Sequence, residues 1–318
     1  MLYDNVLASI GNTPLVHITD ISGLEHINLF AKLEFYNPTG SIKDRAAQYV
    51  INKMLNIGTI NRETVIIESS SGNFGIALSA ICKMNGMKFI CVIDPNISPI
   101  NEFLISSFGA KIDKVQEADQ NGGYLLTRIN KVNELLGNLP GSYWVNQYAN
   151  VYNAEAYYQT IGNEICNDME HIDFIFLGVG SGGTITGVSK KIKERYPKAK
   201  VIAVDAHGSV IFGNSPQKRL IPGIGSSMVP EILKQALIDD VVWVDELMTV
   251  QSCHQLLGDH LIFAGGSSGS VFAAVHKYFK GKTFATKPNV VVVFPDKGDR
   301  YASTVYNAEW YERELYFK

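Results

Sequence analysis

One lysine stands where an amine could act as a nucleophile. An apolar run over residues 29–33 ends in a turn at Asn37-Pro38, and Ser41 is a suitable N-cap for the helix predicted to follow. Lys43 then lies in the first turn of that helix, where the helix dipole disfavours a positive charge and lowers the pKa of an amine. Only a neutral amine attacks a carbonyl, so Lys43 is a candidate for Schiff-base chemistry. A solvated lysine at a helix end is the alternative that this stretch alone leaves open.

The elements that must position Lys43 are predicted to form an α/β fold. Apolar runs of strand length alternate with amphipathic runs of helix length over most of the chain, which indicates largely parallel sheets. A chain of 318 residues is long enough for two domains, although one large domain also fits. Buried strands are predicted at residues 65–68, 89–93, 174–177, 201–204 and 290–294.

Four polar clusters follow strands or begin helices, at residues 69–73, 178–184, 264–270 and 294–301. The first combines serines with a helix start, which suits a carboxylate. The second is rich in glycine, so its amides can approach a phosphate, and its G-x-G-x-x-G match leaves both a dinucleotide and a single phosphate open. Each cluster alone also fits an ordinary loop or cap. Because ligand sites in parallel sheets lie beyond the carboxyl ends of strands, the four clusters are expected to converge on one crevice.

Composition narrows the classes of partner. The formal net charge is -3 and the pI is about 6.2, so nothing indicates binding to nucleic acid or to an anionic membrane surface, and small molecules are the expected partners. No apolar run approaches the roughly 20 residues of a membrane span. The four cysteines lack metal-site spacing, so we expect reduced thiols in the cytoplasm, without disulfides or a metal site; they are Cys82, Cys91, Cys166 and Cys253.

Six segments in the same order resemble the fold-type II pyridoxal-phosphate family of cysteine synthases and cystathionine β-synthases. The likeness runs nearly from end to end, through residues 11–15, 37–45, 69–73, 180–184, 266–269 and 295–301. It implies a tryptophan synthase β-like fold of two domains, with helices on both faces of largely parallel sheets. Residues 37–149 would form a smaller mobile domain, and residues 1–36 with 150–318 a larger domain that binds the cofactor phosphate. The family also implies a homodimer.

The resemblance assigns roles toward pyridoxal 5'-phosphate. Lys43 would form the Schiff base and move the proton of the substrate α-carbon, Asn73 would meet the 3'-oxygen of the ring, and Ser267 the pyridine nitrogen. A serine at that nitrogen leaves the ring a weaker electron sink, which favours β-elimination and replacement over transamination. The cofactor phosphate would lie against Gly180, Ser181, Gly182, Gly183 and Thr184. The substrate carboxylate would bind Ser69, Ser70, Ser71 and Gln147, and its binding would close the smaller domain.

Further segments are similar to a narrower group in that family, the enzymes that make N-(2-amino-2-carboxyethyl)-L-glutamate for 2,3-diaminopropionate and siderophores. These segments are residues 92–99, 122–129, 146–150, 204–213 and 222–225. Such enzymes join O-phospho-L-serine to L-glutamate, and the likeness implies that Arg128 and Tyr148 bind the leaving phosphate. Gly180 departs from the pattern, since that group has a serine there and cysteine synthases have glycine.

The leading hypothesis is therefore β-replacement on an O-activated L-serine through an aminoacrylate, with glutamate as the nucleophile. A cysteine synthase, or a cysteine-consuming enzyme that releases sulfide, is the alternative that Gly180 favours. A binding or sensor module without catalysis is a third possibility, which the presence of Lys43, Asn73 and Ser267 argues against.

Overall fold

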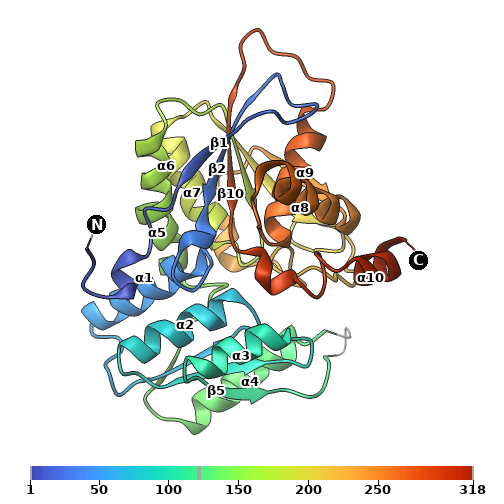
Figure 1. Cartoon of the computed structure of the whole chain (residues 1–318). Coiled ribbons are helices and arrows are strands. Elements are labelled where there is room, and N and C mark those ends of the chain that lie inside the picture. Colours follow the sequence, from blue (N-terminus) through green and yellow to red (C-terminus); the bar gives the residue numbers. More distant parts are fainter. Residues whose placement is uncertain (1, 120–122, 317–318) are drawn as a thin grey trace.

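Two sheets form the framework of the protein, which is described by a computed structural model over residues 2–119 and 123–316 (Figure 1). The larger sheet has the strand order β1-β2-β10-β7-β8-β9, and only the β1–β2 pair is antiparallel. The smaller sheet has the order β5-β4-β3-β6 and is parallel throughout. The predicted α/β fold with largely parallel sheets is thereby confirmed. The strands are β1 (Leu15–Ile18), β2 (Asn28–Leu33), β3 (Val65–Ser69), β4 (Phe89–Ile93), β5 (Lys111–Lys114), β6 (Ser142–Trp144), β7 (Phe174–Gly178), β8 (Lys200–Ala206), β9 (Asp240–Val244) and β10 (Asn289–Phe294).

Helices connect and cover the strands. The α-helices are α1 (Lys43–Asn56), α2 (Asn73–Met84), α3 (Pro99–Ser107), α4 (Leu125–Asn138), α5 (Val151–Tyr157), α6 (Asn163–Asp168), α7 (Gly183–Arg195), α8 (Glu246–His260), α9 (Gly266–Phe279) and α10 (Ala308–Tyr311). Shorter 3-10 and π segments are η1 (Val6–Ser9), η2 (Glu34–Tyr36), η3 (Tyr158–Gly162), η4 (Glu231–Gln235), η5 (Gly298–Tyr301) and η6 (Glu312–Tyr316). No helix in the described part of the chain is long and apolar enough to cross a membrane.

Both faces of the larger sheet are buried, which explains why its central strands are almost continuously apolar. Ile175 and Leu177 of β7 belong to the core shared with α5 and α7, whereas Phe176 between them packs into the core shared with α9. The same alternation divides Val291 and Val292 of β10 between the two cores. Alternate side chains of a strand point to opposite faces, so each strand needs apolar residues at every position.

The smaller sheet repeats this arrangement. Ile66 of β3 packs into the core that includes α1 and α2, and Ile67 packs with Val132 of α4 on the other face. Helix α1 lies between the two sheets and contacts both α2 and α5 (Figure 1). Lys43, the first residue of α1, is therefore placed where the two parts of the protein meet.

Several predicted boundaries need correction. Ile42, not Ser41, directly precedes α1, although the Ser41 hydroxyl still accepts a hydrogen bond from the Lys43 N–H at 3.3 Å. Helix α9 begins at Gly266, so most of the polar cluster at residues 264–270 forms its first turn and not a loop before it, whereas α2 begins at Asn73, the last residue of the cluster at residues 69–73. The strands β1, β5, β6 and β9 were not predicted; most are short or polar, so they give little periodic signal.

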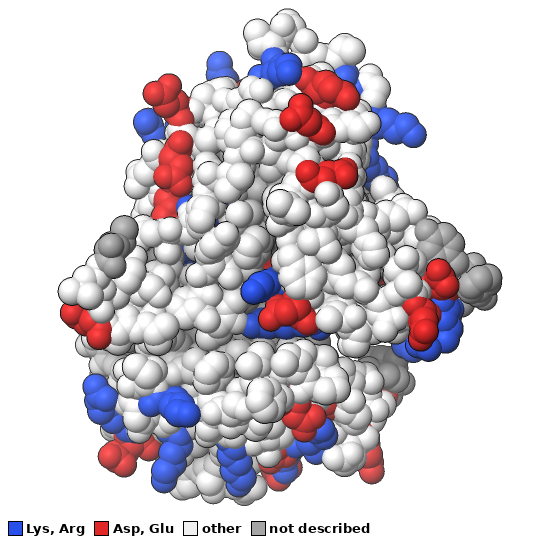
Figure 2. All heavy atoms as spheres, in the orientation of Figure 1, with Lys and Arg blue, Asp and Glu red and all other residues white. Residues whose placement is uncertain are grey.

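Charges of both signs are intermixed on the face of the molecule shown in Figure 2. Such a mixture is ordinary for a soluble surface and agrees with the nearly balanced composition, in which 28 Lys and Arg residues stand against 31 Asp and Glu residues.

Candidate active site

The polar clusters meet in one crevice at the carboxyl ends of β3, β7 and β10. Its cavity measures about 520 Å³ and receives residues from both sheets. The predicted site residues that line it are Lys43, Ser69, Ser70, Ser71, Asn73, Arg128, Gln147, Tyr148, Gly180, Ser181, Gly182, Thr184 and Ser267. Gly183, the first residue of α7, does not line the cavity; it is buried against the side chain of Asn153. Gly122, part of the narrower resemblance, lies outside the described residues.

Lys43 reaches into the crevice from the start of α1. Its Nζ lies 3.4 Å from the Ser181 hydroxyl and 5.9 Å from the centre of the Tyr157 ring. Burial lowers the pKa of Lys43 to about 8, and the nearby carboxylate of Asp296 raises it in part. The predicted direction is confirmed, but burial rather than the helix dipole is the largest cause. With this pKa about a quarter of the amine is neutral near pH 7.5, which is enough to attack a carbonyl.

The backbone of the glycine-rich turn before α7 can approach a phosphate closely. Gly182 has φ +83°, a left-handed conformation in which an L side chain is strained. A Cβ at Gly183 would lie 2.7 Å from the side-chain amide of the buried Asn153, so this position also requires glycine. A Cβ at Gly180 would lie 3.2 Å from the carbonyl oxygen of Gly223. No side chain at these glycines keeps an anion away from the backbone N–H groups of the turn. The turn lies at the N-terminus of the 13-residue helix α7, where the helix dipole favours an anion.

Asn73 is held rigidly by two residues to which the sequence had assigned no role. Its Nδ2 donates to Asp296 Oδ2 at 2.7 Å, and its Oδ1 accepts a hydrogen bond from Arg300. Asp296 also accepts from the Tyr301 hydroxyl at 2.8 Å, and burial raises the pKa of Asp296. Asp296 and Arg300 lie in the polar cluster at residues 294–301, but nothing in that local sequence indicates which side chain contacts Asn73.

The three serines at the carboxyl end of β3, Ser69 to Ser71, differ in their bonding. The Ser69 hydroxyl is buried and has no hydrogen-bond partner among the described residues. The Ser70 hydroxyl accepts from the Gly75 N–H at 3.0 Å and so supports the start of α2. The Ser71 hydroxyl donates to Asp94 at 2.8 Å. The hydrogen-bonding capacity of the Ser69 hydroxyl is therefore unused, and Gln147 lies beside this residue with its Nε2 3.2 Å from the Ser69 carbonyl oxygen.

Arg128 lies on the crevice wall with its charge already paired. Its Nη1 is 2.9 Å from the Ser71 hydroxyl and 3.1 Å from Asp94 Oδ2. Its Nε has no partner among the described residues. Burial raises the pKa of the neighbouring Tyr148, and the Arg128 charge opposes that rise. Asp94 is a third residue to which the sequence had assigned no role, and any anion bound by Arg128 must compete with it.

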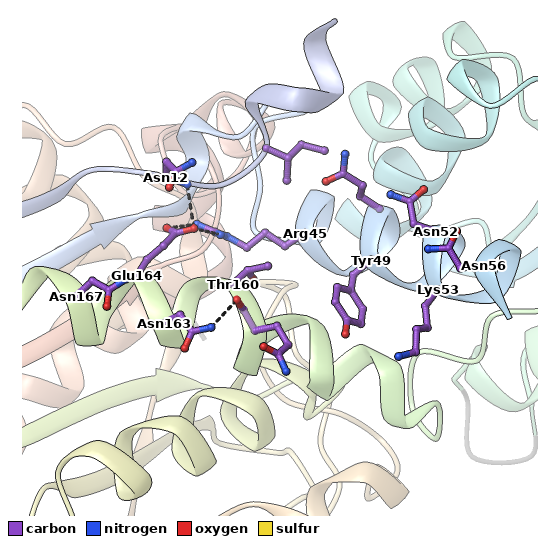
Figure 3. A pocket seen from close by; sticks show the side chains of 13 residues that line it. Asn12, Arg45, Tyr49, Asn52, Lys53, Asn56, Thr160, Asn163, Glu164 and Asn167 are labelled. Carbon is purple, nitrogen blue, oxygen red and sulfur yellow. Dashed lines mark hydrogen bonds and ion pairs between the residues drawn. The ribbon is translucent and has the colours of Figure 1, made fainter. Parts of the chain in front are cut away.

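A second cavity of about 530 Å³ lies beside α1 and shares no lining residue with the crevice (Figure 3). On its wall, Arg45 forms ion pairs with Glu34 at 2.6 Å and with Glu164 at 2.5 Å. Glu164 also accepts a hydrogen bond from the Asn12 N–H. Because Arg45 is only two residues beyond Lys43, this buried network fixes the start of α1 and hence the lysine.

A crevice lysine beside a glycine-rich helix start in this two-sheet fold is typical of enzymes that use pyridoxal phosphate. The chain belongs to the family described as pyridoxal-phosphate dependent enzymes, whose model matches residues 6–296. Its cofactor is therefore pyridoxal phosphate.

Solved structures of the cysteine synthase and cystathionine β-synthase type are similar over nearly their whole length. The O-acetylserine dependent cystathionine β-synthase of Helicobacter pylori is 31% identical, with a TM-score of 0.89 over 96% of this chain and 100% of that one. A hydrogen sulfide-producing enzyme of Fusobacterium nucleatum is 31% identical, with a TM-score of 0.88 over 94% and 100%. O-ureido-L-serine synthase is 27% identical, with a TM-score of 0.88 over 97% and 96%.

The crevice residues fit this cofactor. The turn at Gly182 leaves room for a phosphate, the amine of Lys43 has a lowered pKa, and Ser267 presents a hydroxyl rather than a carboxylate from the crevice wall. These three features come from separate elements, yet all line one cavity.

Proposed function

We propose that this enzyme catalyses β-replacement on O-phospho-L-serine with the amine of L-glutamate as the nucleophile. The product is N-(2-amino-2-carboxyethyl)-L-glutamate, a source of 2,3-diaminopropionate for siderophores. The position of Arg128 carries the proposal: it lies in the crevice next to Ser71, beside the segment to which we assign the substrate carboxylate. A guanidinium there can bind a leaving phosphate by charge-assisted hydrogen bonds.

Pyridoxal phosphate, when bound, supplies a carbonyl for the substrate amine and an electron sink. In this proposal, the hydroxyl of Ser69 and the amide of Gln147 bind the substrate carboxylate and orient the α-carbon. Lys43, as a neutral amine, accepts the α-proton and later returns it. Arg128 stabilises the negative charge that develops on the leaving phosphate, and Ser267 offers only a neutral hydroxyl to the ring nitrogen.

We further propose that residues 37–149 are a smaller mobile domain that closes when the carboxylate binds, against a larger domain of residues 1–36 and 150–318. Ser69 ends one strand of the smaller sheet and Gln147 follows another, whereas Ser181 follows a strand of the larger sheet and Ser267 lies at the start of a helix packed upon it. Closure would bring these two groups together around the substrate. A homodimer in the cytoplasm is part of the same proposal and follows from the family resemblance.

A cysteine synthase, or a lyase that consumes cysteine and releases sulfide, is the second candidate. Asp94 favours it, because this carboxylate neutralises Arg128 and would repel a phosphate dianion, whereas an acetyl group carries no charge. Gly180 favours it too: a serine Cβ at this position would press against the Gly223 carbonyl oxygen.

The test is to add O-phospho-L-serine or O-acetyl-L-serine to the holoenzyme and follow the cofactor absorbance. Glutamate or sulfide is then added and the product is identified by mass spectrometry. We expect phosphoserine to change the spectrum and glutamate to reverse the change with formation of the amino-acid adduct. Reversal by sulfide alone, with acetylserine as the better donor, would establish the second candidate. A preparation that shows no cofactor absorbance would point to a module without catalysis.

A further inference from the structure

Glu68 is a buried carboxylate directly behind the proposed carboxylate site. It is fully buried near the end of β3 and does not line the crevice. Its Oε1 accepts hydrogen bonds from the Ser69 N–H at 2.8 Å and from Trp144 Nε1 at 3.1 Å, and its Oε2 accepts from the Gln147 N–H at 3.2 Å. One side chain thus joins the two segments that carry Ser69 and Gln147, which are 78 residues apart.

This carboxylate has no positive partner. Among the described residues it forms no ion pair, and its contacts are neutral N–H groups. The titratable groups around it are the thiol of Cys91 on β4 and the phenols of Tyr143 and Tyr148, and burial raises the pKa of all three, so they are neutral. The guanidinium on the crevice wall, Arg128, is already paired with Asp94.

A negative charge in this position is poorly compensated. Burial raises the pKa of Glu68 to about 7, although the surrounding N–H groups lower it in part. An amino-acid carboxylate bound at Ser69 and Gln147 adds a second negative charge beside the first. Two negative charges this close to each other favour the protonated form of Glu68.

We propose that Glu68 is a positioning residue that joins the two segments of the carboxylate site, and that it takes up one proton from solvent when an amino-acid carboxylate binds. The inference rests on the proposed location of that carboxylate, but not on the identity of the donor or of the nucleophile. No bond to substrate is made or broken by Glu68; its carboxylate becomes a carboxyl group, and release of the carboxylate returns the proton.

The test uses L-alanine, which has the α-carboxylate and amine but no leaving group. Binding to the holoenzyme is measured by calorimetry in two buffers of different ionisation enthalpy between pH 7 and 8.5, which gives the number of protons exchanged. The substrate amine and the cofactor exchange the same protons in the wild type and in Glu68→Gln. The difference between the two proton numbers therefore reports the protons taken up by Glu68. If binding raises the Glu68 pKa by one unit, the difference reaches about half a proton, and alanine affinity of the wild type falls up to tenfold relative to Glu68→Gln as pH rises.

Glu63→Gln is the matched control, because Glu63 is exposed just before β3 and carries the same charge. It should behave as the wild type. Equal proton numbers for the wild type and Glu68→Gln would overturn the proposal. So would a Glu68→Gln enzyme that binds alanine normally at every pH and is slowed only in the reaction with the nucleophile.

A second variant keeps the test informative if Glu68→Gln does not fold. Trp144→Phe removes one N–H donor from the ionised form of Glu68 and so raises its pKa. The maximum of proton uptake should therefore move to higher pH, while kcat with a productive donor changes less than KM. An unmoved maximum would contradict the role of Glu68. Because alanine needs neither phosphoserine nor glutamate, failure here is distinct from failure of the proposed donor.

Discussion

Replacing Arg128 by alanine removes a cation that makes two polar contacts on the crevice wall. Its Nη1 lies 3.1 Å from Asp94 and 2.9 Å from Ser71. If Arg128 binds the leaving phosphate, its loss removes a charge-assisted hydrogen bond worth about 1.5–3 kcal/mol. That free energy corresponds to a fall of roughly tenfold to a hundredfold in kcat/KM with O-phospho-L-serine.

The change also leaves Asp94, whose side chain is only 8% exposed, without its cation. An uncompensated buried charge lowers the activity with any donor, so the informative quantity is the ratio of the two donors. O-acetyl-L-serine brings no dianion, and its kcat/KM should fall less than that of phosphoserine. Asp94→Asn should act in the opposite direction, because it removes the competing carboxylate and frees the guanidinium for phosphate. The ratio of phosphoserine to acetylserine activity should therefore rise in Asp94→Asn.

The assay is initial-rate kinetics with both donors and a saturating nucleophile. Lys131→Ala is the control, since Lys131 is a cation on the same helix α4 that does not line the crevice. Equal losses with both donors in Arg128→Ala would refute the phosphate contact and leave Arg128 as a structural partner of Asp94. An Asp94→Asn ratio no different from that of the wild type would refute the competition between Asp94 and phosphate.

Three further outcomes follow from the same geometry. Lys43→Ala should abolish turnover while circular dichroism shows an intact fold; more than a trace of β-replacement would exclude the assigned role. Capture of pyridoxal phosphate by the apoenzyme, followed by absorbance, should accelerate as pH rises toward 8 and level off above it, because the Lys43 pKa of about 8 sets the fraction of neutral amine; a flat pH profile would contradict this. Gly182→Ala should cost about 1–2 kcal/mol, because Gly182 has a left-handed backbone conformation, and the variant should lose the cofactor faster on dialysis. Gly137→Ala is the control, since a Cβ at Gly137 on α4 meets open space. Equal cofactor retention by the two variants would count against phosphate binding at the turn before α7.

Each local segment suggested a chemistry but left an ordinary loop or cap open, and only the six segments taken together resembled the pyridoxal-phosphate family. Lys43, the serines at the carboxyl end of β3 and the glycines before α7 each lie within a short segment whose turn and helix-start residues can be recognised without any distant contact. The alternation of strand and helix patterns likewise predicted the parallel sheets, because central strands buried on both faces must be apolar throughout. Short or polar strands such as β5 and β6 give no such pattern, and their pairing with β4 and β3 comes from the register of the sheet.

Only the tertiary structure decided which side chains restrain the candidate catalytic residues. Asn73 and Asp296 are 223 residues apart, and Ser71 and Arg128 are 57 apart. Glu68 follows three apolar residues in β3 and nothing beside it in sequence indicates contact with Trp144 or Gln147. Such contacts depend on how strands and helices pack, which no local propensity encodes. The sequence by itself therefore predicted the cofactor and the class of enzyme, and the packing of two sheets around α1 determined the charges that surround the crevice.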